Sequence, residues 1–429
     1  MKTLLKDAKV FDNKYKGQFI KKDLIVDSEK VIADFDKEQS SCLYDRVFDF
    51  KNKYIIPGFV DVHVHLREPG FFYKESIKTG TLAGAHGGYT TVCSMPNLNP
   101  PPNNIENLET QLEIINRDAV INVLPYGTIT RTGNGRSELA DMASTAPYVI
   151  GFSDDGRGIQ AGELMEEAML VAKSLDKPIV AHCEDESLLE GGYIHKGKYA
   201  KLHSHRGISS ESEWVQVARD VELAAKTGCK YHVCHISTKE TVDIIRQAKK
   251  SGVDVSCETA PHYLILTDMD LHDEGRFKMN PPIRSLEDRD ALIEGIKDGT
   301  IDMIATDHAP HSVEEKSRGL EKSAFGIVGL ETSFAVLNTY LVREGIIPLE
   351  ELVKLMSINP RDRFSLTGPR TLGHGSEICD ITVLDPSKAW TINSSEFMSK
   401  GRATPFDGVD VVGKAVATFV GGKLKFLEV

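Results

Sequence analysis

The middle of the chain alternates short runs rich in β-branched residues with longer segments that carry an apolar face at helical spacing. Parallel strands need a crossover between them, and a helix supplies it, so this alternation restricts the chain to α/β architectures. Eight strand–helix units in about 280 residues predict a (β/α)₈ TIM-like barrel rather than an open doubly wound sheet. The predicted strands span residues 54–65, 89–95, 121–129, 148–154, 178–184, 230–237, 254–261 and 301–308.

The segments between these runs have the features of amphipathic helices. In 238–251, Val242, Ile245 and Ala248 recur at helical spacing, and Ser237 followed by Glu240 forms a capping-box pattern at its start. No G-x-G-x-x-G motif follows the first strand, which argues against a dinucleotide-binding fold. The predicted helices span residues 105–118, 137–145, 162–175, 210–227, 238–251 and 286–297.

Both ends of the chain differ from its middle. Residues 1–53 and 370–429 contain short alternating runs separated by Gly and Asp turns, which is typical of small antiparallel sheets. Chain termini often lie close together, so the two ends can form one unit. We therefore predict a small β-sandwich side domain from 1–53 and 370–429, beside a barrel of residues 54–369. The runs that predict its strands are 24–26, 47–50, 381–384, 409–412 and 416–419.

Charge and cysteine content exclude several classes of protein. Basic residues number 51 and acidic residues 63, a net charge of 51 − 63 = −12, so the surface has no bulk attraction for nucleic acid or anionic lipid. No apolar run has the length of a membrane helix, and the first residues lack the apolar core of a signal peptide. The seven cysteines include no C-x-x-C pair, which predicts a reduced, cytoplasmic protein without disulfides.

The strongest chemical signal is His63-Val64-His65 at the end of the first predicted strand. Residues i and i+2 of a strand point to the same side, so both imidazoles face one space and can bind a zinc ion at about 2.0–2.1 Å. Active sites of such barrels form at the carboxyl ends of the strands, which favours a metal site over two hydrogen-bonded histidines. Arg67 lies two residues further on the same side and can form a bidentate pair with an anionic group.

Other ligand-type side chains end other predicted strands. Together with His63 and His65 they exceed the three protein ligands of one catalytic zinc, and two metal ions about 3.5–4 Å apart would use them all. Strand alternation leaves Asp154 and Asp155 equivalent as the bridging carboxylate. The same alternation predicts that Cys183 and Cys234 point outward and that His232 is structural. The further ligand candidates are Asp154 or Asp155, His182, His235 and Asp307.

These residues belong to a wider resemblance. The segments DVHVHLREPG (61–70) and ATDHAPHSVEEK (305–316) resemble the two signatures of the long bacterial dihydroorotases, members of the amidohydrolase superfamily. The resemblance extends over essentially the whole chain, and it implies a metal-dependent barrel with a β side domain built from both termini. Further matching segments are 95–97, 152–156, 181–184, 235–237, 258–262, 280–282 and 359–360.

The resemblance also implies a reaction and a cofactor. The reaction is the reversible interconversion of L-dihydroorotate and N-carbamoyl-L-aspartate in de novo pyrimidine synthesis, and the cofactor is Zn²⁺, two per subunit with one held more weakly. Related hydantoinases carry a carbamylated lysine where this chain has 152–156, and no lysine occurs there. The resemblance therefore puts the bridge on Asp155. For the reaction that it implies, we predict that Asp307 is the proton shuttle, which takes the proton of the hydroxide and delivers it to the leaving ring nitrogen.

Substrate contacts follow from the same match. Asn97 and His311 are expected to join Arg67 at the substrate carboxylate, with His65 beside them. Asn280 and the backbone of Phe325 and Gly326 are expected to contact the ring amide edge. We further expect the long polar segment 310–326 to order over bound substrate.

Two alternatives to a dihydroorotase are left open. One is another cyclic amidohydrolase, a hydantoinase or an allantoinase, against which the Arg67, Asn97 and His311 set and the missing lysine argue. The other is a catalytically silent homologue that scaffolds aspartate transcarbamoylase, which would be expected to have lost metal ligands. We expect a homodimer, and we leave open a complex with aspartate transcarbamoylase.

Overall fold

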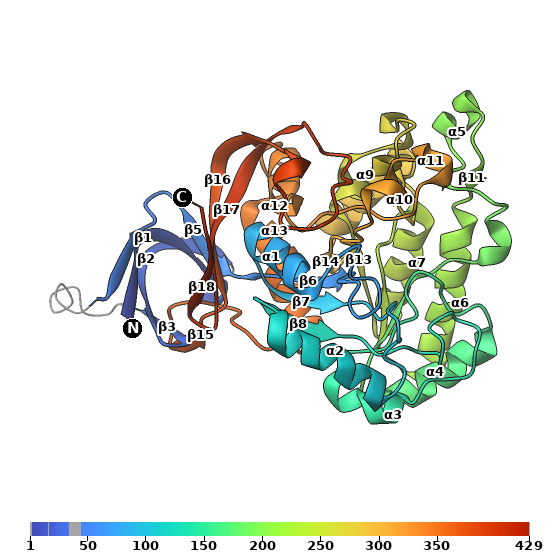
Figure 1. The fold of residues 1–429 in the computed structure, drawn as a ribbon, viewed down its shortest axis with the longest axis horizontal. Helices are drawn as coiled ribbons and strands as arrows, with labels where there is room; N and C mark the ends of the chain where they lie inside the picture. Colours follow the sequence, from blue (N-terminus) through green and yellow to red (C-terminus); the bar gives the residue numbers. More distant parts are fainter. Residues whose placement is uncertain (1, 16, 34–43, 429) are drawn as a thin grey trace.

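The computed structural model describes residues 2–15, 17–33 and 44–428. Figure 1 shows a larger part in which helices surround a set of central strands, and a smaller part made of strands from both ends of the chain. Cys42 lies outside the described residues, and the other six cysteines are buried and free of disulfide bonds. In the described part of the chain, no helix is long and apolar enough to cross a membrane.

The central strands form a ring of parallel pairings. One sheet has the order β6-β7-β8 and the other the order β14-β13-β12-β9. Parallel bridges join Gly127 to Phe152 and Phe152 to Ile179 on one side, and Val64 to His308 on the other, so eight segments close on themselves. The strands are β6 (Phe59–Val64), β7 (Tyr89–Ser94), β8 (Asn122–Pro125), β9 (Ile179–Ala181), β12 (Tyr231–Val233), β13 (Val255–Thr259) and β14 (Met303–Ile304).

The observed ring strands are all shorter than the predicted ones, and two predicted strands differ further. The run 54–65 is divided at Gly58, where a β-carbon would lie 2.1 Å from the Thr90 side chain. Its first half, β5 (Tyr54–Pro57), pairs in the side sheet, and only its second half joins the ring. The run 148–154 contributes only the isolated bridges of Phe152, and a turn at residues 155–157 follows it.

The helices α2 (Ile105–Asp118), α4 (Gly162–Ser174), α6 (Glu211–Thr227), α7 (Lys239–Lys250) and α9 (Leu286–Lys297) confirm the predicted ranges within one residue. The prediction for 137–145 was wrong in extent, because only α3 (Met142–Thr145) is helical there.

The predicted N-cap of α7 was also wrong. Thr238 caps this helix by accepting a hydrogen bond from the backbone N–H of Thr241, whereas the Ser237 hydroxyl donates to Glu213. Glu213 also accepts from the Thr238 hydroxyl at 2.9 Å, so a buried carboxylate of α6 organises this turn. The cap therefore lies one residue later than the sequence pattern suggested.

The side sheet joins both ends of the chain. It contains nine strands in the order β15-β3-β2-β1-β5-β16-β17-β18, with β4 beside β1. A separate apolar core of Leu5, Val26, Ile381 and Phe419, among others, fills this part. Its strands are β1 (Lys2–Asp12), β2 (Gln18–Asp27), β3 (Lys30–Ala33), β4 (Arg46–Asp49), β5, β15 (Ser376–Ile378), β16 (Ile381–Thr391), β17 (Asp410–Val420) and β18 (Lys423–Leu427).

Helix α1 (Ile77–Gly87) connects the two parts. Thr418 of β17 donates to the carbonyl of Ala85, and Thr382 of β16 donates to the carbonyl of Gly88 just after the helix. The side sheet is thus anchored by hydrogen bonds to the first helix of the ring.

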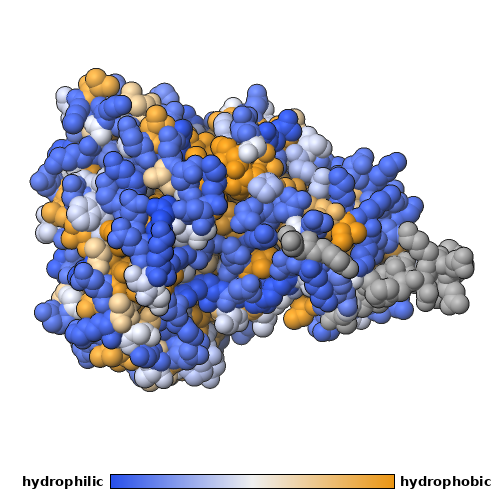
Figure 2. Space-filling view, turned by 180° about the vertical axis from the view of Figure 1, so that it is seen from behind, coloured by the Kyte–Doolittle hydropathy of each residue, from blue (hydrophilic) through white to orange (hydrophobic). Residues whose placement is uncertain are grey.

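Figure 2 shows one face of the molecule, which is mainly hydrophilic with scattered apolar patches.

Candidate metal centre and active site

The predicted ligand side chains come from the carboxyl ends of the ring segments. His63 lies in β6 with His65 just after it, while the others follow the Phe152 bridge, β9, β12 and β14. Parallel strands end on the same face of a closed ring, so side chains far apart in sequence meet there. The residues brought together are His63, His65, Asp155, His182, His235 and Asp307.

Asp155 is at the centre of this cluster. Its Oδ1 lies 3.3 Å from His63 Nε2, 3.5 Å from His235 Nε2 and 3.7 Å from His182 Nδ1. Its Oδ2 lies 3.4 Å from His65 Nε2. Burial would raise the pKa of Asp155, but the charge of His63 and the nearby His235 outweigh it and hold the pKa well below its ordinary value. One ionised carboxylate therefore faces four imidazoles.

Asp154 has a different role, so the structure separates the two neighbouring aspartates. Its carboxylate accepts hydrogen bonds from the backbone N–H groups of Ile129, Thr130 and Gly135 at 2.8–3.1 Å. It therefore organises the loop after β8 and does not face the histidines.

Asp307 completes the cluster on the side of His65. Its Oδ1 lies 3.1 Å from His65 Nε2 and 3.6 Å from His63 Nε2. Burial would raise the pKa of Asp307, but the hydrogen bond with His65 and the charge of His63 outweigh it and lower the pKa.

The backbone is strained at three residues of the site. The φ angles are 60° at Arg67, 32° at His235 and 48° at Asp307, left-handed values that are unfavourable for residues other than glycine. Such strain is concentrated at functional sites.

Further buried residues orient the first two histidines. Glu258 in β13 accepts from His63 Nδ1 at 2.7 Å and contacts His232 Nε2 at 2.9 Å. Asn97 Oδ1 accepts from His65 Nδ1 at 2.9 Å. Burial would raise the pKa of Glu258, but the two histidines beside it outweigh this effect and hold the pKa at about 2. Both imidazoles thus direct Nε2 to the centre, the usual arrangement of metal-binding histidines.

Sequence reasoning assigned no role to Glu258. A charged residue inside a buried β-branched strand was the available signal, because such a residue needs a partner. The sequence did not reveal its partners, since His63 is 195 positions away.

Cys234 was predicted to point outward, and this prediction was wrong. Its side chain lies in the apolar cluster inside the ring, near His63 and Glu258. Cys234 lies on the same inner side as His232, and the positive φ of His235 turns that residue inward as well, so alternation breaks at His235. Cys183 does face the helices, where its Sγ lies 3.2 Å from the Tyr231 hydroxyl.

The donor set fits divalent metal ions. Among the described residues, His63 Nε2 and Asp155 Oδ1 are fully buried and have no hydrogen-bond partner. His182 Nδ1 and His235 Nε2 lie 3.0 Å apart. Imidazole nitrogens with carboxylate oxygens are typical zinc ligands. The atoms of His63, His65 and Asp307 form one compact group, and those of His63, Asp155 and His235 form another.

A cavity of about 540 Å³ opens above this cluster. All predicted substrate contacts line it together with five of the six ligand residues, and His63 lies beneath them. The predicted contacts are His65, Arg67, Asn97, Asn280, His311, Phe325 and Gly326. Sequence reasoning missed Gly156, Arg157, Glu184, Leu189 and Ala309, which line the same space.

Arg67 and His311 form a cationic end of this cavity. Arg67 Nε donates to the carbonyl of Pro310 at 3.2 Å, and its Nη2 donates to His311 Nε2 at 3.3 Å. Burial, followed by the charges of Arg67 and Lys74, lowers the pKa of His311 to about 3. The imidazole is therefore neutral, and the Arg67 guanidinium carries the positive charge.

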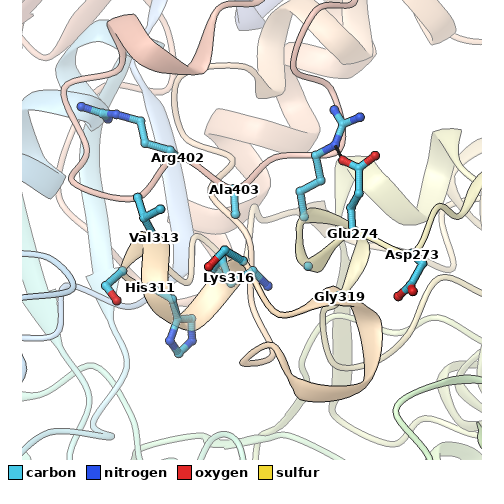
Figure 3. A pocket seen from close by; sticks show the side chains of 12 residues that line it. Asp273, Glu274, His311, Val313, Lys316, Gly319, Arg402 and Ala403 are labelled. Atoms are coloured by element: carbon cyan, nitrogen blue, oxygen red, sulfur yellow. Dashed lines mark hydrogen bonds and ion pairs between the residues drawn. The ribbon is translucent and has the colours of Figure 1, made fainter.

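A second cavity of about 330 Å³ lies beside the segment 310–326 (Figure 3). The segment contains two short helices, α10 (Val313–Lys316) and α11 (Gly319–Lys322), that the sequence did not predict. Lys316 is buried, and its Nζ donates to the carbonyls of Lys278 and Ala324. Burial, with a smaller effect of Lys278, lowers the pKa of Lys316 to about 7. His311 lines both cavities, so this segment separates them.

Comparisons with known proteins agree with this geometry. A family model described as Dihydro-orotase-like matches residues 52–241. A curated relative from Fusobacterium nucleatum named dihydroorotase is 49% identical over 426 residues, covering 99% of this chain and 98% of the relative. A dihydroorotase from Listeria innocua is 48% identical over 429 residues, covering 99% of each chain.

Solved structures share the fold. An L-hydantoinase from Arthrobacter aurescens has a TM-score of 0.87 at 26% identity, covering 99% of this chain and 96% of that one. A dihydropyrimidinase from Brevibacillus agri has a TM-score of 0.85 at 22% identity, covering 100% and 95%. The second likeness concerns the fold alone.

Proposed function

The chain belongs to the dihydroorotase family, which makes it a cyclic amide hydrolase, and we propose that it works through two zinc ions held at the carboxyl end of the ring. Its reaction is the reversible opening of L-dihydroorotate to N-carbamoyl-L-aspartate in pyrimidine synthesis. The observation that carries the proposal is the single buried carboxylate of Asp155 among four histidines, beneath a cavity with Arg67 at one end.

The six ligand residues divide between the two ions. His63, His65 and Asp307 would hold one, His182 and His235 the other, and Asp155 both. Zinc held by these residues would lower the pKa of a bound water molecule and polarise the attacked carbonyl. Glu258 and Asn97 keep His63 and His65 in the tautomer that this requires.

Asp307 is our proposed proton shuttle. Its low pKa leaves it ionised and able to accept a proton from the attacking water. It then delivers this proton to the leaving ring nitrogen, and in the cyclising direction it removes a proton from the ureido nitrogen. Its position at the end of the eighth segment, beside His65, supports this role.

The cavity fits the substrate by charge and polarity. Arg67 would bind the substrate carboxylate, with Asn97 as a further hydrogen-bond donor and His311 beside them, where its neutral Nε2 accepts from the guanidinium and orients it. Asn280 and the Phe325–Gly326 backbone would contact the ring amide edge. Turnover of dihydroorotate, hydantoin and allantoin, measured side by side, tests this assignment: preference for hydantoin or allantoin would contradict it.

Replacing Arg67 with glutamine is expected to raise KM for dihydroorotate by about 10- to 100-fold, because a charge-assisted hydrogen bond to the carboxylate is lost. Steady-state kinetics measure the change. Arg67→Lys is the matched control, which keeps the charge and should recover part of the affinity. An unchanged KM in Arg67→Gln would remove this residue from the carboxylate site.

We propose that segment 310–326 closes over bound substrate. Its residues His311, Phe325 and Gly326 line the cavity, which supports such a role. Limited proteolysis is expected to cut this segment several-fold more slowly in the presence of dihydroorotate. Cleavage at the same rate with and without substrate would count against closure.

The ring of eight parallel segments supports a (β/α)₈ barrel, and the curled side sheet supports a small β-sandwich domain. We propose Gly58 rather than residue 53 as the first domain boundary, a choice supported by the pairing of β5 with β1 and β16. The homodimer, a complex with aspartate transcarbamoylase and the cytoplasmic location stay predictions.

A further inference from the structure

Glu184 is a carboxylate in the cavity wall to which the proposed mechanism gives no role. It follows the ligand His182 by two residues, and its side chain is 11% exposed. Its backbone N–H donates to Gln216 Oε1 at 3.0 Å, which fixes the turn that carries it. The side chain is therefore held at the cavity and not free in solvent.

The closest polar contact of this carboxylate is Asn280. Glu184 Oε1 accepts from Asn280 Nδ2 at 3.0 Å, whereas Oε2 lies 3.7 Å from His182 Nε2. A distance of 3.7 Å is too long for a hydrogen bond, so the amide is the defined partner. Glu184 thus hydrogen-bonds to Asn280 through one oxygen and lies within ion-pair distance of His182 through the other.

This contact fixes the orientation of the Asn280 amide. A carboxylate only accepts hydrogen bonds, so the amide must turn its NH₂ group to Glu184. Asn280 Oδ1 is then buried at the cavity, and no residue in the described part of the chain hydrogen-bonds to it. A buried acceptor without a partner costs about 1–3 kcal/mol, which a ligand N–H can recover.

We propose that Glu184 is a positioning residue that makes Asn280 an obligate acceptor for a ring N–H of the substrate. The inference rests on the proposed contact between Asn280 and the ring amide edge. A ring nitrogen that carries a hydrogen satisfies Asn280 Oδ1, whereas a carbonyl or an alkylated nitrogen at that place leaves it unpaired. Glu184 therefore selects the substrate through Asn280 without touching the reacting atoms.

An exchange of the two functional groups tests the proposal. In Glu184→Gln, the new amide can donate to Asn280, which lets Asn280 turn its NH₂ group to the substrate. We expect KM for dihydroorotate to rise at least 10-fold, with a smaller change in kcat and unchanged zinc content. In Asn280→Asp, two carboxylates face each other, and KM should rise further.

The double variant Glu184→Gln/Asn280→Asp restores the original polarity with the same total charge. The introduced amide at position 184 would donate to one oxygen of the introduced carboxylate at position 280, and the other oxygen would face the substrate as an acceptor. We expect its KM to return to within about threefold of the wild-type value. KM increases that multiply in the double variant would overturn the proposal, as would a normal KM in Glu184→Gln.

A control and a second probe complete the experiment. Glu186→Gln removes a neighbouring carboxylate that does not line the cavity, and it should leave KM unchanged. Dihydroorotate methylated at its ring amide nitrogen is the second probe. It should bind the wild-type enzyme at least 10-fold more weakly than unmethylated dihydroorotate does. Equal binding of the two compounds would also overturn the proposal. Zinc content and turnover of the wild type test the proposed function separately. If both are normal and the double variant is not rescued, only the role of Glu184 fails.

Discussion

Replacing Asp307 with asparagine is expected to lower kcat for dihydroorotate by about 10²- to 10⁴-fold, the usual contribution of a positioned acid–base group. Asparagine has almost the same shape and keeps an oxygen near His65, which lies 3.1 Å from the native carboxylate. It cannot accept a proton from the attacking water. The defect should therefore appear in kcat, while zinc content stays largely unchanged.

Kinetics and elemental analysis of the same preparation separate these two effects. Asp290→Asn, an exposed carboxylate of α9 paired with Arg289, is the control and should have normal turnover. A near-normal kcat in Asp307→Asn would remove Asp307 from the shuttle role. Complete loss of zinc in this variant would instead make it chiefly a ligand.

Replacing Asp155 with alanine is expected to remove most of the bound zinc and to lower the activity at least 10³-fold. A loss of this size is within the rate enhancement that a metal-activated nucleophile and a polarised carbonyl contribute. Its two oxygens lie within 3.3–3.7 Å of four histidine nitrogens. Without this carboxylate, the site would have one negative charge fewer to balance the positive charge of two zinc ions among four buried imidazoles.

The neighbouring Asp154 provides the matched control. Its carboxylate binds backbone N–H groups of the loop after β8, so Asp154→Asn should lower thermal stability and retain zinc. Zinc measured by elemental analysis decides between the two neighbours. Zinc retained in Asp155→Ala and lost in Asp154→Asn would reverse their assignments.

Strand-end position was the informative signal in the sequence. His63 lies near the end of β6 and the other five ligand residues follow ring segments, and the closure of the ring brings them together regardless of their spacing in the chain. Alternation within a strand failed at the ends of strands. The positive φ of His235 breaks the alternation, so Cys234 and His235 both face inward, and alternation likewise left Asp154 and Asp155 equivalent until the fold was known.

The remaining features depend on contacts between distant parts of the chain. Glu258 binds His63 across 195 positions, and Glu184 binds Asn280 across 96. No local sequence pattern indicates such pairs, because the two residues of each pair hydrogen-bond to one another only in the folded chain. The division of the first strand at Gly58 has a similar origin, since the close approach of Thr90 exists only in the assembled ring.

Zinc stoichiometry measured together with dihydroorotate hydrolysis tests the central claim most directly. Two zinc ions per chain are predicted, with the second lost more readily, and turnover should fall on chelation and return when zinc is added back. Full turnover of dihydroorotate by chelator-treated protein that retains no metal would contradict the account.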